Sequence, residues 1–164
     1  MSHGRPPRRP RYAPRSDVFT SVLKRATRHT AAEIEQLMAP VDRALSALRK
    51  GVATEAEWYQ LGAAIEVSQA IEAQGVVRGL REHLSSAERA LAGIRARAMD
   101  SGEWHPTALY YQELDDVSEA IRLHRFQLEQ VSAGELAKAY RRADNQVHQA
   151  GGIFVSMEQL RIAA

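Results

Sequence analysis

The sequence predicts an all-α fold, a helical bundle that contains one long antiparallel helical hairpin. Four segments space their apolar residues at steps of three and four, which is the period of one helix face. Three of these segments begin with a capping box, in which a hydroxyl and a Glu three residues later satisfy each other's backbone amides. No run shows the sustained alternation of a half-buried strand.

The first helix is expected to start at the capping box Thr30-Ala-Ala-Glu33 and to end before Gly51, a residue suited to the position after a helix. Pro40 lies inside this helix, and we expect it to kink the helix or to separate a short first piece. The apolar stripe consists of Ile34, Leu37, Met38, Val41, Leu45 and Leu48.

A second helical segment follows the box Thr54-Glu-Ala-Glu57 and runs to about Met99 without a proline. Gly75 is the weak point of this segment, because glycine costs roughly 1 kcal/mol relative to alanine inside a helix. We expect a bend or break there. Beyond it the stripe has heptad spacing and indicates a long helical partner: Val77, Leu80, Leu84, Ala87, Leu91, Ile94 and Ala98.

The third helix is expected to begin around Pro106 or Thr107, after a loop. Its stripe matches the length of the preceding one: Tyr110, Leu114, Val117, Ile121, His124, Leu128 and Val131. Two matched stripes joined by a short loop predict an antiparallel hairpin, and they are also compatible with a homodimer. His124 takes an inward position, so we expect it in the core or in an interface, with a pKa below its ordinary value.

A fourth helix starts at the box Ser132-Ala-Gly-Glu135 and stops at Gly151-Gly152. These elements divide the chain into a basic arm and linker at 1–29, a bundle at 30–152 and a tail at 153–164. We expect the apolar triplet Ile153, Phe154 and Val155 of the tail to dock on the protein.

The charge is distributed unevenly along the chain. Residues 1–28 carry a net charge of +7 and the remainder −5, within a total of +2. Four of the six prolines also lie in the first fifteen residues, so we expect residues 1–16 to be a disordered arm. Arginines bind phosphate, and Tyr12 could stack on an unpaired base. The candidate nucleic-acid contacts are Arg5, Arg8, Arg9, Arg11, Tyr12 and Arg15; the alternative is a solvated tail or one that docks on the acidic body.

Motifs that carry chemistry are absent from the sequence. The chain has no cysteine, no phosphate-binding glycine loop and no nucleophile elbow, so we expect no enzyme, no cofactor and no metal. No apolar run is long enough to span a membrane, and none follows the basic start as in a signal peptide. We therefore expect a cytoplasmic protein without membrane contact.

Candidate protein contacts gather where the hairpin turns. Trp104 and Tyr111 lie near this loop, and acidic residues follow at the start of the third helix. These residues could form a contact surface for a basic partner, although tryptophan could also cap the bundle end and the carboxylates could complement the helix dipole. The candidate set is Trp104, Tyr111, Glu113, Asp115, Asp116 and Glu119. Lys138, Arg141 and Arg142 could form a second basic face with Arg122 and Arg125, but one sequence does not set the phases of separate helices.

Two segments carry a resemblance to known proteins. The start Arg-Pro-Arg-Tyr-Ala-Pro-Arg, at 9–15, resembles the Arg/Pro-rich opening of many small proteins of proteobacterial plasmids and phages. Leu48-Arg-Lys-Gly-Val-Ala-Thr54, with Trp58 through Ile65, is similar to the helix–turn–helix core of such uncharacterised proteins. The 19 arginines against 3 lysines are typical of a GC-rich bacterial genome. The resemblance implies a mobile-element accessory protein, a class that includes host-interaction factors and inhibitors of bacterial defence.

Two functions therefore remain as expectations. The first is a non-enzymatic helical binding protein, a phage or plasmid factor that acts on a protein partner such as a bacterial host complex or a defence system. The second is a nucleic-acid-associated accessory protein that holds the phosphate backbone through its N-terminal arm.

Overall fold

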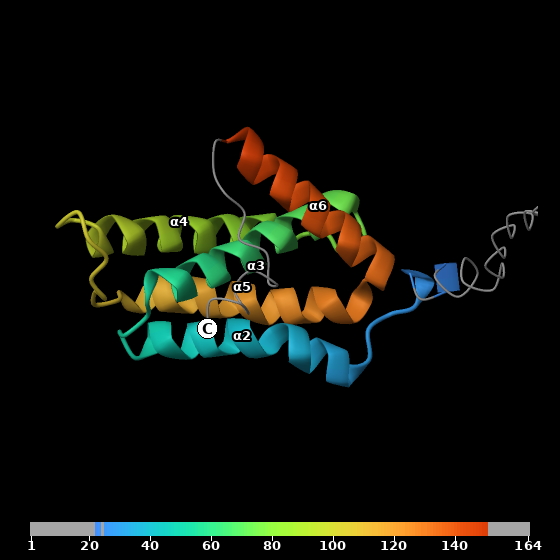
Figure 1. Ribbon diagram of the computed structural model, residues 1–164, viewed down its shortest axis with the longest axis horizontal. Coiled ribbons are helices and arrows are strands. Elements are labelled where there is room, and N and C mark those ends of the chain that lie inside the picture. The colour runs from blue at the N-terminus through green and yellow to red at the C-terminus, as the bar shows by residue number, and fades with distance from the viewer. Residues whose placement is uncertain (1–21, 24, 151–164) are drawn as a thin grey trace, which may run out of the picture.

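The computed structural model describes residues 22–23 and 25–150, which form an all-α bundle without a strand (Figure 1). The predicted fold class is therefore confirmed. The arm at 1–16 and the apolar triplet of the tail lie outside the described residues. None of the helices in the described part of the chain is long and apolar enough to cross a membrane.

The helices are α2 (Ala31–Arg49), α3 (Glu55–Gln74), α4 (Arg81–Ala98), α5 (Tyr111–Gln130) and α6 (Ala133–Gln149). In Figure 1, α2, α4 and α5 lie with their axes nearly aligned, and α6 crosses obliquely over α3. Helix α3 is central, since it packs against each of the other four.

All three predicted capping boxes are present. Thr30, Thr54 and Ser132 each accept a hydrogen bond from the backbone three residues on, and the Glu at that position accepts one from the cap amide. Helix α2 continues through Pro40. Its first turns slope away from the rest of the helix in Figure 1, as the predicted kink requires.

The long second segment breaks at Gly75, as predicted. This residue takes a left-handed conformation with φ of +82°, which favours glycine, and it ends α3. The following turn is held by Glu72, whose Oε1 accepts hydrogen bonds from the amides of Gly79, Leu80 and Arg81 at 2.9–3.1 Å. A side chain at the end of α3 therefore caps the start of α4.

Helices α4 and α5 form the predicted antiparallel hairpin and make the most extensive helix–helix contact of the described chain. The predicted start of α5 is wrong, because the helix begins at Tyr111 instead of Pro106 or Thr107. Glu113 accepts from the amide of Tyr110 at 3.0 Å, which sets the helix start at this point. Tyr110 is consequently exposed at the end of the stripe instead of packing within it.

The apolar stripes of α2, α3, α4 and α5 meet in one core, to which α6 adds Leu136, Ala139 and Ala143. One polar layer crosses this core. Ser68 of α3 donates to the carbonyl oxygen of Ala64 at 2.8 Å, and its Oγ lies 2.7 Å from Nδ1 of His124. Gln127 Nε2 donates to the carbonyl oxygen of Ser68 at 3.0 Å. The predicted burial of His124 is correct, and its hydrogen-bond partner Ser68 lies on α3.

The segment before α2 returns to the start of α6. Residues 22, 23, 25 and 26 are helical, and Arg28 then forms an isolated backbone bridge with Ser132. The amide of Ala133 donates to the carbonyl oxygen of Thr27 at 3.0 Å. This contact places the chain that leads from the N-terminal arm directly beside α6.

Candidate protein-interaction face on α5

Helix α5 packs its inner side against α2, α3 and α4 and leaves its outer side uncovered by the other described helices. Residues on that side recur at steps of three and four, so they fall within a sector of about 80°. They are Tyr111, Asp115, Glu119, Arg122 and Phe126, all exposed except Glu119, which is half-buried. We call these five residues the α5 outer face.

Aromatic rings lie near both ends of the α5 outer face. Tyr111, in the first turn, is 82% exposed, and Phe126, near the other end, is 44% exposed. The adjacent Tyr110 is 65% exposed, and the guanidinium of Arg97 lies 4.7 Å from its ring centroid. Exposed aromatic side chains of this kind are enriched in protein interfaces, where they become buried against the partner.

The centre of the α5 outer face is acidic. Asp115 is exposed and forms no ion pair with the described residues. Glu119 pairs with Arg122 at 2.5 Å, and the hydrogen bond from that guanidinium lowers the pKa of the Glu119 carboxyl. The Glu119 carboxylate is therefore charged at neutral pH. Asp116 lies beside the face, half-buried, and accepts a hydrogen bond from Gln112 at 3.1 Å.

Glu113 belongs to the hairpin contact and lies on the inner side of α5. Arg97 of α4 holds it with two hydrogen bonds of 2.8 and 2.5 Å. Burial acts to raise the pKa of this carboxyl, but the hydrogen bonds from Arg97 and from the amide of Tyr110, with the Arg97 charge, lower it overall. Glu113 therefore ties α4 to the start of α5, and most of its surface is covered.

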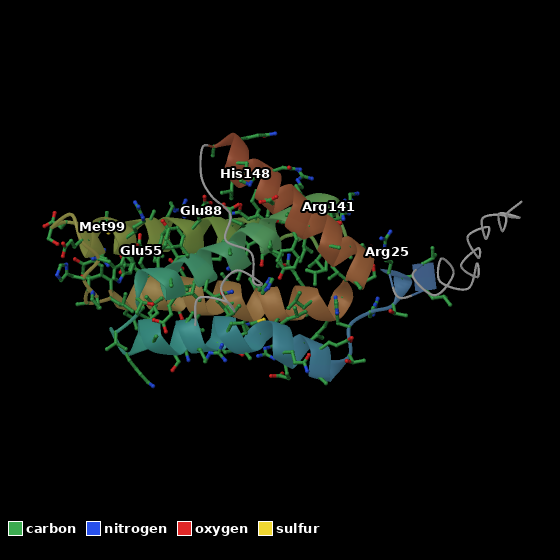
Figure 2. All side chains as sticks on the ribbon, in the orientation of Figure 1. Arg25, Glu55, Glu88, Met99, Arg141 and His148 are labelled. Atoms are coloured by element: carbon green, nitrogen blue, oxygen red, sulfur yellow. The ribbon has the colours of Figure 1, made fainter. Side chains whose placement is uncertain are left out.

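Trp104 caps the end of the bundle, the structural alternative considered for it above. Its Nε1 donates to the carbonyl oxygen of Ala53 at 2.9 Å, and its ring lies 6.2 Å from that of Trp58. Trp58 in turn donates to the carbonyl oxygen of Leu91 at 2.8 Å. Both indoles are half-buried and join the α2–α3 loop, α3, α4 and the hairpin loop at one end of the bundle. In Figure 2, the labels of Glu55 and Met99 mark this end.

The structure therefore brings Tyr111, Asp115 and Glu119 onto one face, places Asp116 at its margin, and assigns Glu113 and Trp104 to internal contacts. Phe126 was not among the predicted contacts, because it lies outside the apolar stripe and the acidic cluster. The sequence signal that could have identified Phe126 is its position fifteen residues after Tyr111. This spacing is about four helical turns, so both rings lie on the same side of the helix.

The candidate nucleic-acid residues Arg5, Arg8, Arg9, Arg11, Tyr12 and Arg15 lie outside the described residues. Among the residues that the structure does describe, no three His, Asp or Glu side chains gather as metal ligands. Comparisons of the chain with protein-family models, with curated proteins and with solved structures found no match.

Proposed function

We propose that this chain is a non-enzymatic binding protein that engages another protein through the α5 outer face. The observation that carries the proposal is the 82% exposure of Tyr111 on a helix whose opposite side is fully engaged in the core. Leaving a large aromatic ring in water gains nothing for folding, whereas burying it against a partner removes apolar surface from water.

The chemistry of the face defines the kind of partner. Two rings flank a centre that holds Asp115 and the ion pair of Glu119 with Arg122, so the matching surface has apolar pockets on either side of a basic group that faces Asp115. The resemblance to phage and plasmid accessory proteins extends this proposal to a bacterial host complex or defence system as the target. A cytoplasmic location belongs to the same proposal.

The test is quantitative capture from bacterial lysate with three forms of the full chain: the parent, Tyr111→Ala/Phe126→Ala, and the control Val76→Ala. Val76 is an exposed apolar residue on the α3–α4 connection, outside the α5 outer face. We expect at least one protein to be retained by the parent and by the control and to be lost by the double variant.

The captured protein is then purified and titrated against each form. A central aromatic contact costs about 2 kcal/mol or more on truncation, so the double variant should weaken binding by about 30-fold or more. Asp115→Asn should lower the association rate and its salt dependence. Identical affinities for the parent and the double variant would exclude the α5 outer face as the binding surface.

A further inference from the structure

Helix α6 carries a basic stripe on the side that faces away from α3. Lys138, Arg141, Arg142 and Asn145 recur at steps of three, one and three, which places them on one face. All four are exposed, whereas Leu136, Ala139 and Ala143 on the opposite side are buried. The stripe extends for about 10 Å along the helix.

Two further arginines adjoin the start of this stripe. Arg28 bridges Ser132, at the N-cap of α6, and the backbone oxygen of Arg25 lies so close to Gly134 that a Cβ there would be 2.8 Å away. Both arginine side chains are exposed. Arg25 and Arg141 are labelled in Figure 2, where Arg25 lies beside the start of α6 and Arg141 farther along it. We call the five cations Arg25, Arg28, Lys138, Arg141 and Arg142 the α6 basic face.

The charge of the α6 basic face is not neutralised within the described chain. None of its five cations forms an ion pair with the residues described. Glu135, in the first turn of α6, is engaged in the cap of the helix; its hydrogen bonds with Ser132 lower its pKa, and the charges of Arg28 and Lys138 contribute to this. Asp144 pairs with His148 at 3.2 Å. Arg122 and Arg125, which the sequence left open as members of a second basic face, pair with Glu119 and with Glu35 and Asp42 respectively.

The sequence ahead of the described residues is also positively charged. Residues 1–21 continue from the helical turn beside α6 and contain five arginines and a single acidic residue, Asp17. An arm of this sign is repelled by the α6 basic face, which argues against the arm as its occupant. The exposed cations of the α6 basic face instead suit a ligand with many closely spaced negative charges.

We propose that the α6 basic face binds the phosphate backbone of double-stranded nucleic acid. A duplex carries one charge per about 1.7 Å of its axis, so the stripe of about 10 Å can face several phosphates. Arginine and lysine on an exposed helix are suited to such contacts. No Phe, Tyr or Trp ring is exposed among the described residues of α6, so large rings on which unpaired bases could stack are lacking there, which favours a duplex over a single strand. This proposal is independent of the α5 outer face.

The test is a titration of the full chain against a labelled DNA duplex of random sequence, followed by fluorescence anisotropy at several salt concentrations. The variant is Lys138→Gln/Arg141→Gln/Arg142→Gln. The matched control is Lys50→Gln/Arg43→Gln/Arg89→Gln, which removes the same residue types from exposed sites on α2, its C-cap and α4. The α6 variant should bind about 10-fold more weakly at about 50 mM salt, and its log–log salt slope should fall by about 2 to 3. The control should remain close to the parent.

Several outcomes would overturn the proposal. Equal weakening by both triple variants would mean that only the net charge matters. An unchanged α6 variant would leave the arm as the sole contact.

Binding to phosphatidylserine vesicles without binding to the duplex would assign the face to a membrane surface. Self-association is measured by sedimentation. If the parent self-associates, the α6 variant is monomeric, and both bind DNA with equal affinity, then the occupant of the face is a second copy of the chain. Circular dichroism of each variant establishes that the comparison is between folded proteins.

Discussion

At the residue scale, the buried layer of Ser68, His124 and Gln127 links α3 to α5 through polar atoms. The single hydroxyl proton of Ser68 is directed to Ala64, so Nδ1 of His124 carries the proton that Ser68 Oγ accepts. The imidazole is neutral at pH 7, because its pKa lies well below that value. Because the ring is only 4% exposed, burial lowers its pKa to about 4.

This pKa predicts a stability that depends on pH. The unfolded chain binds a proton near pH 6.5 and the folded chain only near pH 4, so the free energy of unfolding falls as the pH drops through this interval. The loss attributable to His124 is on the order of 3 kcal/mol at full protonation. His124→Leu should flatten the profile in urea unfolding between about pH 4 and 6.5. His83→Leu, at an exposed position, is the control, and a parental profile for His124→Leu would contradict the prediction.

At the element scale, the α3–α4 turn depends on one carboxylate. Glu72→Ala removes the acceptor of three amides at the start of α4. We expect a loss of about 1–3 kcal/mol in the free energy of unfolding. Hydrogen exchange should accelerate at Gly79, Leu80 and Arg81. Glu129→Ala, at an exposed site in α5, should change neither quantity, and unchanged exchange in the Glu72 variant would show that the turn is held by other contacts.

The hairpin seam gives a second prediction at this scale. Leu84 of α4 is completely buried, whereas Leu114 of α5 is only half-buried, since α5 starts late and its first turns lie at the margin of the core. Leu84→Ala should cost about 2–5 kcal/mol, and Leu114→Ala about half as much or less. Chemical denaturation measures both. Equal costs, or a cost below about 0.5 kcal/mol for Leu84→Ala, would be inconsistent with this packing.

At the scale of the whole molecule, the segment before α2 is attached to α6 through a close backbone contact. Gly134→Ala would place a Cβ 2.8 Å from the carbonyl oxygen of Arg25, so the segment has to move away. We expect faster tryptic cleavage after Arg25 and Arg28, with little loss of global stability. Gly62→Ala is the control: its Cβ would meet nothing within 4 Å, so it should stabilise α3 by about 0.5–1 kcal/mol without altering cleavage. Unchanged cleavage in Gly134→Ala would mean that the segment tolerates the added methyl group.

The two proposed surfaces occupy different helices, which makes them separable by mutation. The α5 outer face holds carboxylates at its centre and aromatic rings near its ends, whereas the α6 basic face consists of five exposed cations. We expect Tyr111→Ala/Phe126→Ala to leave the affinity for duplex DNA unchanged, because neither ring belongs to the α6 basic face. A parallel loss of protein and DNA binding in that variant would indicate one shared surface.

Local signals in the sequence were sufficient for much of this fold. The three capping boxes and the break at Gly75 follow from residues a few positions apart, whose energetics depend on the helix itself. The pairing of α4 with α5 follows from two apolar stripes of equal length joined by a short loop. The same holds for the burial of His124, which its heptad position predicts.

Tertiary structure alone decided which charges are used internally and which remain free. Arg97 with Glu113, and Arg125 with Glu35 and Asp42, pair across helices, and Glu72 caps a helix that is not its own. Such contacts depend on how the helices are rotated relative to one another. The hydrophobic period does not determine this rotation, because an apolar stripe shows which side of a helix is buried but not which residues of another helix lie beside it. Once these pairs are formed, Tyr111 and Asp115 on α5 and the cations of α6 are left exposed. The candidate surfaces are therefore a consequence of packing.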